Sequence, residues 1–174
     1  NALSVTHTKT GGGETYLHNL VGAMLGERGD WSFFLFVREA DRDAFPFEAP
    51  NFTIVECPNV GNPYLRAAYE QTGLRRRVKK LGLDVLHCPA NFAVLGAGIP
   101  TVVTIQMVQT LAVPHLNRRS RAARFLVNQM LMRSARSATL LTTVSEGTRQ
   151  EIITRLGVAE DRVTAIHHGG AGAG

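Results

Sequence analysis

Three consecutive glycines, Gly11, Gly12 and Gly13, are the residues near the start of the sequence most suited to binding a ligand. They lie between a short apolar segment and an amphipathic pattern, where a strand would pass into a helix. A helix N-terminus offers unpaired N–H groups and a partial positive charge, and glycines let the backbone approach a phosphate closely. Tyr16 stands where the third glycine of a GxGxxG pattern would be, and no Gly-Lys-Ser/Thr follows. The glycines therefore indicate no particular nucleotide. We predict a phosphate site here, with a plain glycine turn as the alternative.

Polar side chains also stand where three later apolar segments end. His87 lies in the segment DVLHCP, Gln106 is the first polar residue after PTVVTI, and Ser145 and Glu146 follow TLLTTV. Because ligands of open α/β sheets bind outside the carboxyl ends of the strands, we expect these side chains at a ligand cleft. Each has a structural alternative: a strand cap for His87, a loop hydrogen bond for Gln106, and helix capping for Ser145 and Glu146.

The sequence predicts no metal site. Adjacent His167 and His168 would point to opposite faces of a strand, and no HExxH-like cluster exists. Cys57 and Cys88 form no CxxC pair, which excludes a cysteine zinc site and a disulfide scaffold. Two reduced thiols are typical of a cytosolic protein, and no apolar run is long enough for a transmembrane helix. We therefore expect a cytoplasmic protein.

Two kinds of apolar pattern alternate along the 174 residues. Short runs rich in β-formers predict strands, and apolar residues at helical spacing predict helices between them. This order favours an α/β fold, a doubly wound and mostly parallel Rossmann-like sheet with helices on both faces. We expect one domain over 1–168 and a flexible glycine-rich tail, or the start of a linker, over 169–174. The predicted strands are 1–5, 31–37, 52–55, 85–88, 101–105, 140–144 and 163–167, and the predicted helices are 14–26, 64–81 with an interruption near Gly73, 119–136, and one between Ser145 and Gly157.

Charge is distributed unevenly. Residues 1–61 have 4 basic and 8 acidic side chains, whereas residues 62–140 have 12 basic and 2 acidic ones. A basic block of this kind implies an anionic neighbour, although solvated helix faces are the simpler alternative. Within this block, one cluster of basic residues comprises Arg75, Arg76, Arg77, Lys79 and Lys80. It has no interleaved aromatic residue, which disfavours a nucleic-acid partner. We expect this cluster to contact an anionic surface.

Five segments, taken in this order, resemble the N-terminal domain of retaining glycosyltransferases with the GT-B fold, family 4, also called group 1 glycosyltransferases. They are GGGETYLHNLVGAML, DVLHCP, PTVVTIQM, RSARSATLLTTVSEGTRQEI and RVTAIHHG. The resemblance implies one half of an enzyme of two Rossmann-like domains with a cleft between them. The N-terminal domain mostly binds the acceptor, and the C-terminal domain binds the nucleotide of the activated sugar. The present chain alone is therefore expected to be inactive.

The resemblance also implies roles for particular residues. Gly12 and Gly13 match the glycine loop that approaches the donor diphosphate, and Gly11 adjoins them. Gln106 matches a catalytic position where the family usually has His, but Gln cannot carry a proton at pH 7. Met107 stands where the family often has an acidic residue. With His87, Ser145 and Glu146, Met107 is expected to contact the acceptor or the sugar.

The reaction that the resemblance implies is sugar transfer, of the hexosyltransferase type, with retention of configuration. The donor is a nucleotide-sugar, the acceptor is an unassigned glycan, lipid or small molecule, and no metal or bound cofactor is required. The basic cluster adds an anionic membrane surface as a further expected partner, which would hold the protein at the inner face of the membrane.

Two other classes of function compete with this interpretation. A dinucleotide-dependent oxidoreductase would need GxGxxG and an acidic residue about 20 positions later. Glu39 lies near that place, but the glycine spacing does not fit. The second alternative is a non-catalytic Rossmann-like domain that binds an anionic surface or a phosphorylated ligand.

Overall fold

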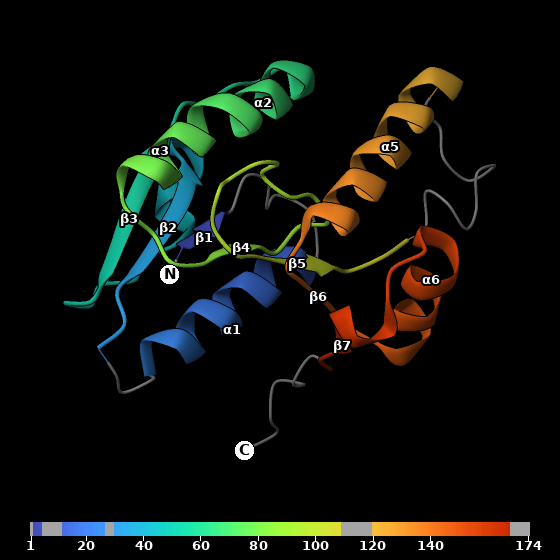
Figure 1. Cartoon of the computed structure of the whole chain (residues 1–174). Coiled ribbons are helices and arrows are strands. Elements are labelled where there is room, and N and C mark those ends of the chain that lie inside the picture. The colour runs from blue at the N-terminus through green and yellow to red at the C-terminus, as the bar shows by residue number, and fades with distance from the viewer. Residues whose placement is uncertain (1, 5–11, 27–29, 109–119, 168–174) are drawn as a thin grey trace.

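The seven strands among the described residues run parallel in one sheet, in the order β3-β2-β1-β4-β5-β6-β7 (Figure 1). The computed structural model describes residues 2–4, 12–26, 30–108 and 120–167. The predicted doubly wound, Rossmann-like fold is confirmed. The strands are β1 (Ala2–Ser4), β2 (Phe33–Arg38), β3 (Phe52–Cys57), β4 (Leu86–Cys88), β5 (Thr101–Ile105), β6 (Leu140–Thr143) and β7 (Val163–Ala165).

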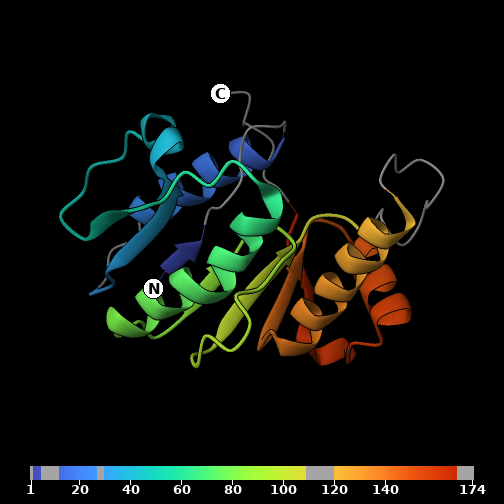
Figure 2. The same cartoon turned by 90° about the horizontal axis from the view of Figure 1, so that it is seen from above.

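Helices cover both faces of this sheet. Figure 1 shows α1 on one face and α2, α3 and α5 on the other. In the view of Figure 2, β4 and β5 are seen between the two helices α3 and α5, which share a face. The helices are α1 (Gly12–Gly26), the 3₁₀ turn η1 (Glu39–Ala44), α2 (Pro63–Tyr69), the π-helical turn η2 (Glu70–Leu74), α3 (Arg75–Lys80), α5 (Arg121–Ser137), α6 (Glu146–Leu156) and the 3₁₀ turn η4 (Glu160–Arg162).

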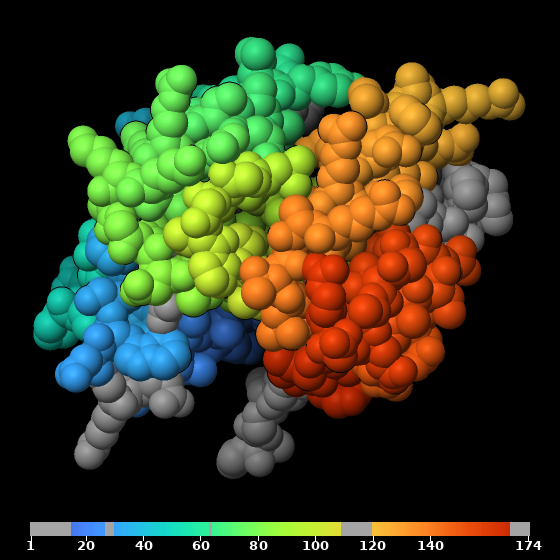
Figure 3. Space-filling view, in the orientation of Figure 1, coloured from blue at the N-terminus to red at the C-terminus, as the bar shows by residue number. Residues whose placement is uncertain are grey.

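The long connection between β4 and β5 is fixed from two sides. The amide of Gln71 donates to the Ala93 carbonyl at 2.9 Å and accepts from the Leu95 N–H at 2.8 Å. From the other side, the hydroxyl of Ser134 in α5 accepts the Ala93 N–H at 2.9 Å. Figure 3 shows this yellow-green segment filling the space between α3 and α5. The connection is thus held between η2 and α5.

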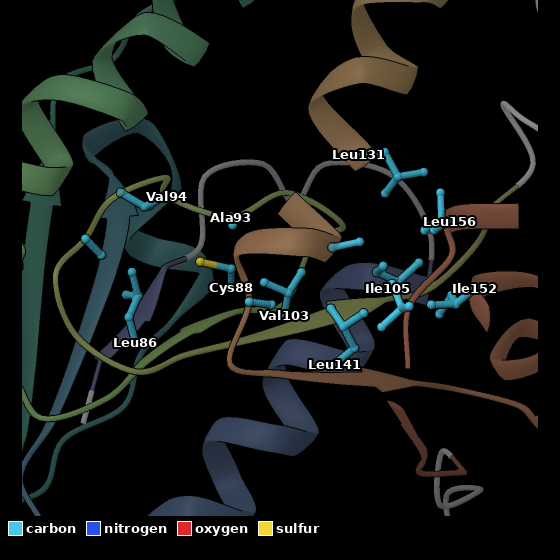
Figure 4. Packing of buried hydrophobic residues seen from close by; sticks show 14 of the residues in the cluster. Leu86, Cys88, Ala93, Val94, Val103, Ile105, Leu131, Leu141, Ile152 and Leu156 are labelled. Atoms are coloured by element: carbon cyan, nitrogen blue, oxygen red, sulfur yellow. The ribbon is translucent and has the colours of Figure 1, made fainter. Parts of the chain in front are cut away.

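One row of in-register residues forms the centre of the main core. Cys88 of β4 pairs with Val103, Val103 with Leu141, and Leu141 with Val163, and all four are buried. Side chains from α5 and α6 close over this row, as Figure 4 shows for Leu131, Ile152 and Leu156. Because strands buried on both faces need apolar residues along their length, these strands read as continuous apolar runs in the sequence.

Several predicted boundaries differ from the observed ones. The strand predicted over 31–37 begins only at Phe33, which pairs with Phe52, whereas Trp31 is exposed. The helix predicted to begin at Glu14 begins at Gly12, so two glycines of the expected loop belong to the first helical turn. The interruption expected near Gly73 is a π-helical turn inside an otherwise continuous helical segment.

The π-helical turn requires glycine at position 73, because the ring of Tyr69 occupies the space where a side chain would lie. A Cβ added at Gly73 would overlap Cε2 of Tyr69 and lie 2.6 Å from its Cδ2. We predict that Gly73→Ala lowers the free energy of unfolding by about 1–3 kcal/mol, the usual cost of overpacking. Urea unfolding of the purified chain measures the change.

Gly22→Ala is the matched control, because Gly22 also lies in a helix but has no atom within 4 Å of an added Cβ. This variant should gain about 0.5–1 kcal/mol from helix propensity. In a Tyr69→Ala background, Gly73→Ala should cost nothing. An equal loss in both backgrounds would show that the tyrosine ring is not the cause.

Candidate functional site

Strand β1 creates the point where the sheet can bind a ligand. Leu3 pairs with Leu35 of β2 on one side and with His87 of β4 on the other. The connections leave in opposite directions from this point, and ligands of open α/β sheets bind outside the carboxyl ends of the strands at such a switch point. Helix α1 begins at the same edge, with Gly12 and Gly13 in its first turn. Its first N–H groups have no partner within the helix and suit an anion. Gly11 lies outside the described residues.

A row of hydrogen-bonded side chains joins neighbouring strands next to this switch point. Nε2 of His87 lies 2.7 Å from Oγ1 of Thr104, which lies 2.8 Å from Oγ1 of Thr142. The hydroxyl of Tyr16, in α1, lies 3.4 Å from the same Thr104 oxygen. Strands β4, β5 and β6 are therefore joined by side chains as well as by the backbone, and α1 is tied to them.

The imidazole of His87 is neutral in this row of hydrogen-bonded side chains. Burial lowers the pKa of its imidazole from 6.5 to about 4, because the charged form would lose its hydration. A neutral ring can exchange a hydrogen bond with the Thr104 hydroxyl. His87 was predicted to contact the acceptor or sugar; the structure gives its Nε2 a partner inside the sheet, and a ligand contact stays a prediction.

Gln106 follows β5 directly and is held by the loop after β4. Its Nε2 donates to the Pro89 carbonyl at 3.2 Å, and its backbone N–H donates to Oδ1 of Asn91 at 2.8 Å. Asn91 adopts a left-handed backbone, with φ of 66°, and its own N–H donates to the Thr104 carbonyl at 3.0 Å. Met107 is exposed beside Gln106. The structural alternative for Gln106, a loop hydrogen bond, is thus present, while its catalytic role stays a prediction.

Ser145 and Glu146 start helix α6 and stabilise it. Oγ of Ser145 accepts the N–H of Thr148 at 3.2 Å, which is the expected N-cap. Glu146 accepts from Arg149 at 2.8 Å, and Arg149 also donates to Glu160 at 2.8 Å. The hydrogen bond from Arg149 lowers the pKa of Glu146. Both predicted ligand residues thus have structural roles, and contact with an acceptor remains a prediction for them.

The predicted basic cluster lies on α3, the last part of a helical segment that runs from the carboxyl edge of the sheet toward its other edge. One guanidinium N–H of Arg77 donates to the Glu56 carbonyl. The guanidinium of Arg75 lies over the loop at Gly96, where an added Cβ would be 3.2 Å from its Cζ. Lys79 lies beside the same loop at Gly98, where an added Cβ would be 3.5 Å from its Cε. Three of the five cations thus lie against the protein itself, and the membrane role of the cluster stays a prediction.

Four residues of the site were missed from the sequence: Tyr16, Asn91, Thr104 and Thr142. The threonines carried a weak signal, since polar residues in otherwise apolar buried strands need partners. Asn91 follows Pro-Ala in a loop, and Asn is one of the residues that tolerate a positive φ. Nothing local indicated that the Tyr16 hydroxyl would reach β5, because the contact spans 88 positions.

The arrangement suits an anionic ligand such as a phosphate. It places the N-terminus of α1 at the same edge of the sheet as the Gln106 amide, while the Thr104 and Thr142 hydroxyls are buried within the sheet. In the part of the chain that the structure describes, no three His, Cys, Asp or Glu residues are grouped so as to hold a metal ion. No helix among the described residues has the length and apolar character needed to cross a membrane.

The sequence profile of Glycosyltransferase Family 4 matches residues 10–169. The chain belongs to glycosyltransferase family 4. The resemblance noted above is thereby confirmed, and the family 4 match includes every predicted site residue. A search of curated proteins finds no match for this family 4 chain.

Solved structures share the fold of this family 4 domain at low sequence identity. HepE of Anabaena, in complex with UDP and glucose, has a TM-score of 0.58 and 13% identity; 97% of the present chain covers 44% of it. A UGT transferase of Siraitia grosvenorii, in complex with UDP, has a TM-score of 0.59 and 12% identity; 97% of the present chain covers 51% of it. UDP-N-acetylglucosamine 2-epimerase of Rickettsia bellii has a TM-score of 0.62 and 9% identity; 94% of the present chain covers 43% of it. The family 4 chain thus spans about half the length of these structures, and they show its GT-B, Rossmann-like fold.

The neutral state of the partly buried His87 imidazole predicts a pH dependence of stability. The pKa of His87 is lower in the folded state than in the unfolded state. Its contribution to the unfolding free energy is therefore at its full value above pH 6.5 and is lost as the pH falls from 6.5 toward about 4. The loss attributable to His87 is about 3 kcal/mol at most. Urea unfolding of wild type and His87→Asn across this range isolates it.

His167→Asn is the control, because His167 is exposed. That variant should keep the wild-type slope, whereas His87→Asn should flatten it between pH 6.5 and about 4. Equal slopes for His87→Asn and wild type would contradict the lowered pKa of the partly buried imidazole.

Proposed function

We propose that this chain is the acceptor-side domain of an enzyme that moves a sugar from a nucleotide-sugar to an acceptor with retention of configuration. The family 4 match over residues 10–169 supports it most strongly. The helix N-terminus at the switch point of the sheet supports it independently. HepE and the Siraitia transferase, which share the fold, were both solved with UDP. We treat residues 1–168 as the domain; residues 168–174 lie outside the described part.

In the proposed reaction the first turn of α1 approaches the donor diphosphate. Charge develops on the leaving phosphate as the glycosidic bond breaks, and N–H groups aimed at that position stabilise it. Gly12 and Gly13 present no side chain larger than hydrogen, so the backbone can come close. The departing phosphate then takes the proton of the attacking hydroxyl on the same face of the sugar, which gives retention without a protein nucleophile.

Gln106 is proposed to orient the sugar. Its amide is fixed through Pro89, and its backbone through Asn91, so its position at the end of β5 is set before any ligand binds. An amide has two N–H donors and an acceptor oxygen, which suit a sugar hydroxyl. Its role is positional, since Gln does not exchange a proton at pH 7. We propose His87, Met107, Ser145 and Glu146 as residues bordering the acceptor.

The acceptor class is left open among glycans, lipids and small molecules. One structure that shares the fold, UGT89C1 of Arabidopsis thaliana, was solved with quercetin. We propose a cytoplasmic location, which the free, buried thiols of Cys57 and Cys88 support. The competing proposal is a non-catalytic domain that binds an anionic surface or a phosphorylated ligand, with Arg75–Lys80 as its contact; the epimerase match shows that the fold alone does not decide between activities.

The glycine pair gives a direct test of the phosphate site. We predict that Gly12→Val with Gly13→Val lowers kcat/KM for the donor by about tenfold or more in the full-length enzyme, because the new side chains block close approach of the backbone to the diphosphate. Steady-state kinetics measure the change. Gly22→Ala, in the open middle of the same helix, is the control and should keep wild-type kcat/KM. A double variant that folds and retains kcat/KM would rule out the phosphate role.

The isolated chain should transfer no sugar. Holding two reactants together supplies about 7–11 kcal/mol of the barrier reduction, and one domain cannot align donor and acceptor. It should also bind nucleotide-sugars weakly, because the contacts to base and ribose belong to the other domain of the proposed enzyme. Calorimetric titration with several nucleotide-sugars and a product assay test both statements. Tight binding or turnover by the chain alone would contradict the two-domain site.

A further inference from the structure

The backbone of Ala93, in the connection between β4 and β5, is held by side chains from two helical elements. Ala93 is 3% exposed, so its N–H and its C=O both need partners inside the protein. The N–H donates to the hydroxyl of Ser134 in α5, and the C=O accepts from the amide of Gln71 in η2. These partners lie 41 and 22 positions away in the sequence. Ala93 is therefore a fixed point of the connection.

Gln71 binds this connection with both ends of its amide group. Its Nε2 donates to the Ala93 carbonyl at 2.9 Å, and its Oε1 accepts the N–H of Leu95 at 2.8 Å. A planar primary amide offers a donor and an acceptor side by side, so it can pair with the C=O of one residue and the N–H of the residue two positions later. The two bonds fix the direction of the segment as well as its position.

Gln71 owes its place to the π-helical turn η2. This turn interrupts a helical segment that is otherwise continuous from α2 to α3. Turns of this kind are rare inside helices and occur frequently at functional sites. The turn lies at the residue that holds the connection, which gives a reason for it beyond the packing of Gly73 against Tyr69.

Two residues before Ala93, Asn91 binds the end of β5. Its N–H donates to the Thr104 carbonyl at 3.0 Å, and its Oδ1 accepts the N–H of Gln106 at 2.8 Å. With a φ of 66°, Asn91 adopts a conformation that residues other than glycine rarely take, and such a conformation persists only where the surrounding structure determines it. The bonds at Ala93 on one side and at β5 on the other provide that constraint.

We infer that Gln71 and Ser134 are positioning residues for Gln106. Together they hold Ala93, the short segment from Ala93 back to Asn91 transmits this constraint, and Asn91 sets the main chain at Gln106. The inference rests on the proposed function, in which Gln106 orients the sugar. It adds two residues that act through the protein and touch no ligand.

The alternative is that both side chains only stabilise the fold. Loss of either one leaves a buried polar group of Ala93 without its partner, which costs stability in both cases. The two roles differ in their effect on Gln106. A purely stabilising role predicts that the whole sheet opens more often, whereas a positioning role predicts that the end of β5 is released preferentially.

The first experiment is amide hydrogen exchange of the 174-residue chain, followed by NMR. The exchange rate of the Gln106 N–H is compared with that of Leu141, which is buried at the centre of the sheet and reports opening of the whole fold. In Gln71→Ala and in Ser134→Ala, the Gln106 rate should rise about tenfold or more relative to the Leu141 rate.

Two further variants sharpen this comparison. Gln71→Glu should act like Gln71→Ala, because a carboxylate keeps an acceptor for the Leu95 N–H but offers no donor to the Ala93 carbonyl. Thr72→Ala is the matched control in the same π-helical turn, since the Thr72 side chain is exposed and its hydroxyl donates to the Ala68 carbonyl. It should leave the ratio of the two rates unchanged.

The second experiment measures turnover by the full-length enzyme with UDP-glucose, UDP-N-acetylglucosamine or GDP-mannose, whichever it uses fastest. Gln71→Ala should lower kcat about tenfold or more, because displacing a positioned group by about 1 Å costs up to about 10²-fold in rate. The KM for the donor should change less, since base and ribose contacts belong to the other domain of the proposed enzyme. In a Gln106→Ala background, Gln71→Ala should lower kcat no further.

The outcomes separate this inference from the proposed function. Exchange of Gln106 in step with Leu141 in the Gln71 and Ser134 variants would overturn the inference, whatever the enzyme does. An equal loss of kcat from Gln71→Ala with and without Gln106 would overturn it as well, because the effect would not pass through Gln106. Wild-type kcat for Gln106→Ala would contradict the proposed role of Gln106 itself, and the exchange rates would still decide whether Gln71 and Ser134 hold its position.

Discussion

The three residues of β1 are the constraint on which the rest of the structure depends. This strand alone joins β2 to β4, so it holds the two halves of the sheet together and sets the point where the connections diverge. Helix α1 is the next described element along the chain and is tied back to β5 through Tyr16 and Thr104. The phosphate site proposed for the glycines is therefore positioned by the sheet, and a shift in the β1 register would move it relative to Gln106.

Polar interactions inside the sheet fix the edge where ligands are expected. The chain from His87 through Thr104 to Thr142 links three strands, and Asn91 joins the β4 loop to the end of β5. Each of these groups would cost free energy if it were buried without a partner, so the set is stable only when all strand ends are correctly aligned. The family 4 domain thus presents a preorganised edge, while the proposed reaction needs a second domain to supply the donor.

The sequence was sufficient for the fold because its strands are short apolar runs separated by helical patterns, and seven of seven parallel strands were anticipated near their observed positions. It was less informative for the site. Ser145 and Glu146 were correctly given capping as an alternative, since an N-cap is a local property. The partners of His87 and Gln106 lie 17 positions away, and that of Tyr16 lies 88 away, so only the folded sheet brings them together. Local pattern carries no information on such contacts.

The central claim is that the first turn of α1, at the switch point of the sheet, is where the donor diphosphate meets this domain. Backbone amide NMR of the chain during titration with inorganic pyrophosphate tests it most directly. The account predicts weak binding with shifts concentrated at Gly12, Gly13 and the end of β5 around Gln106. Shifts concentrated at Arg75–Lys80, with the first turn of α1 unaffected, would contradict it.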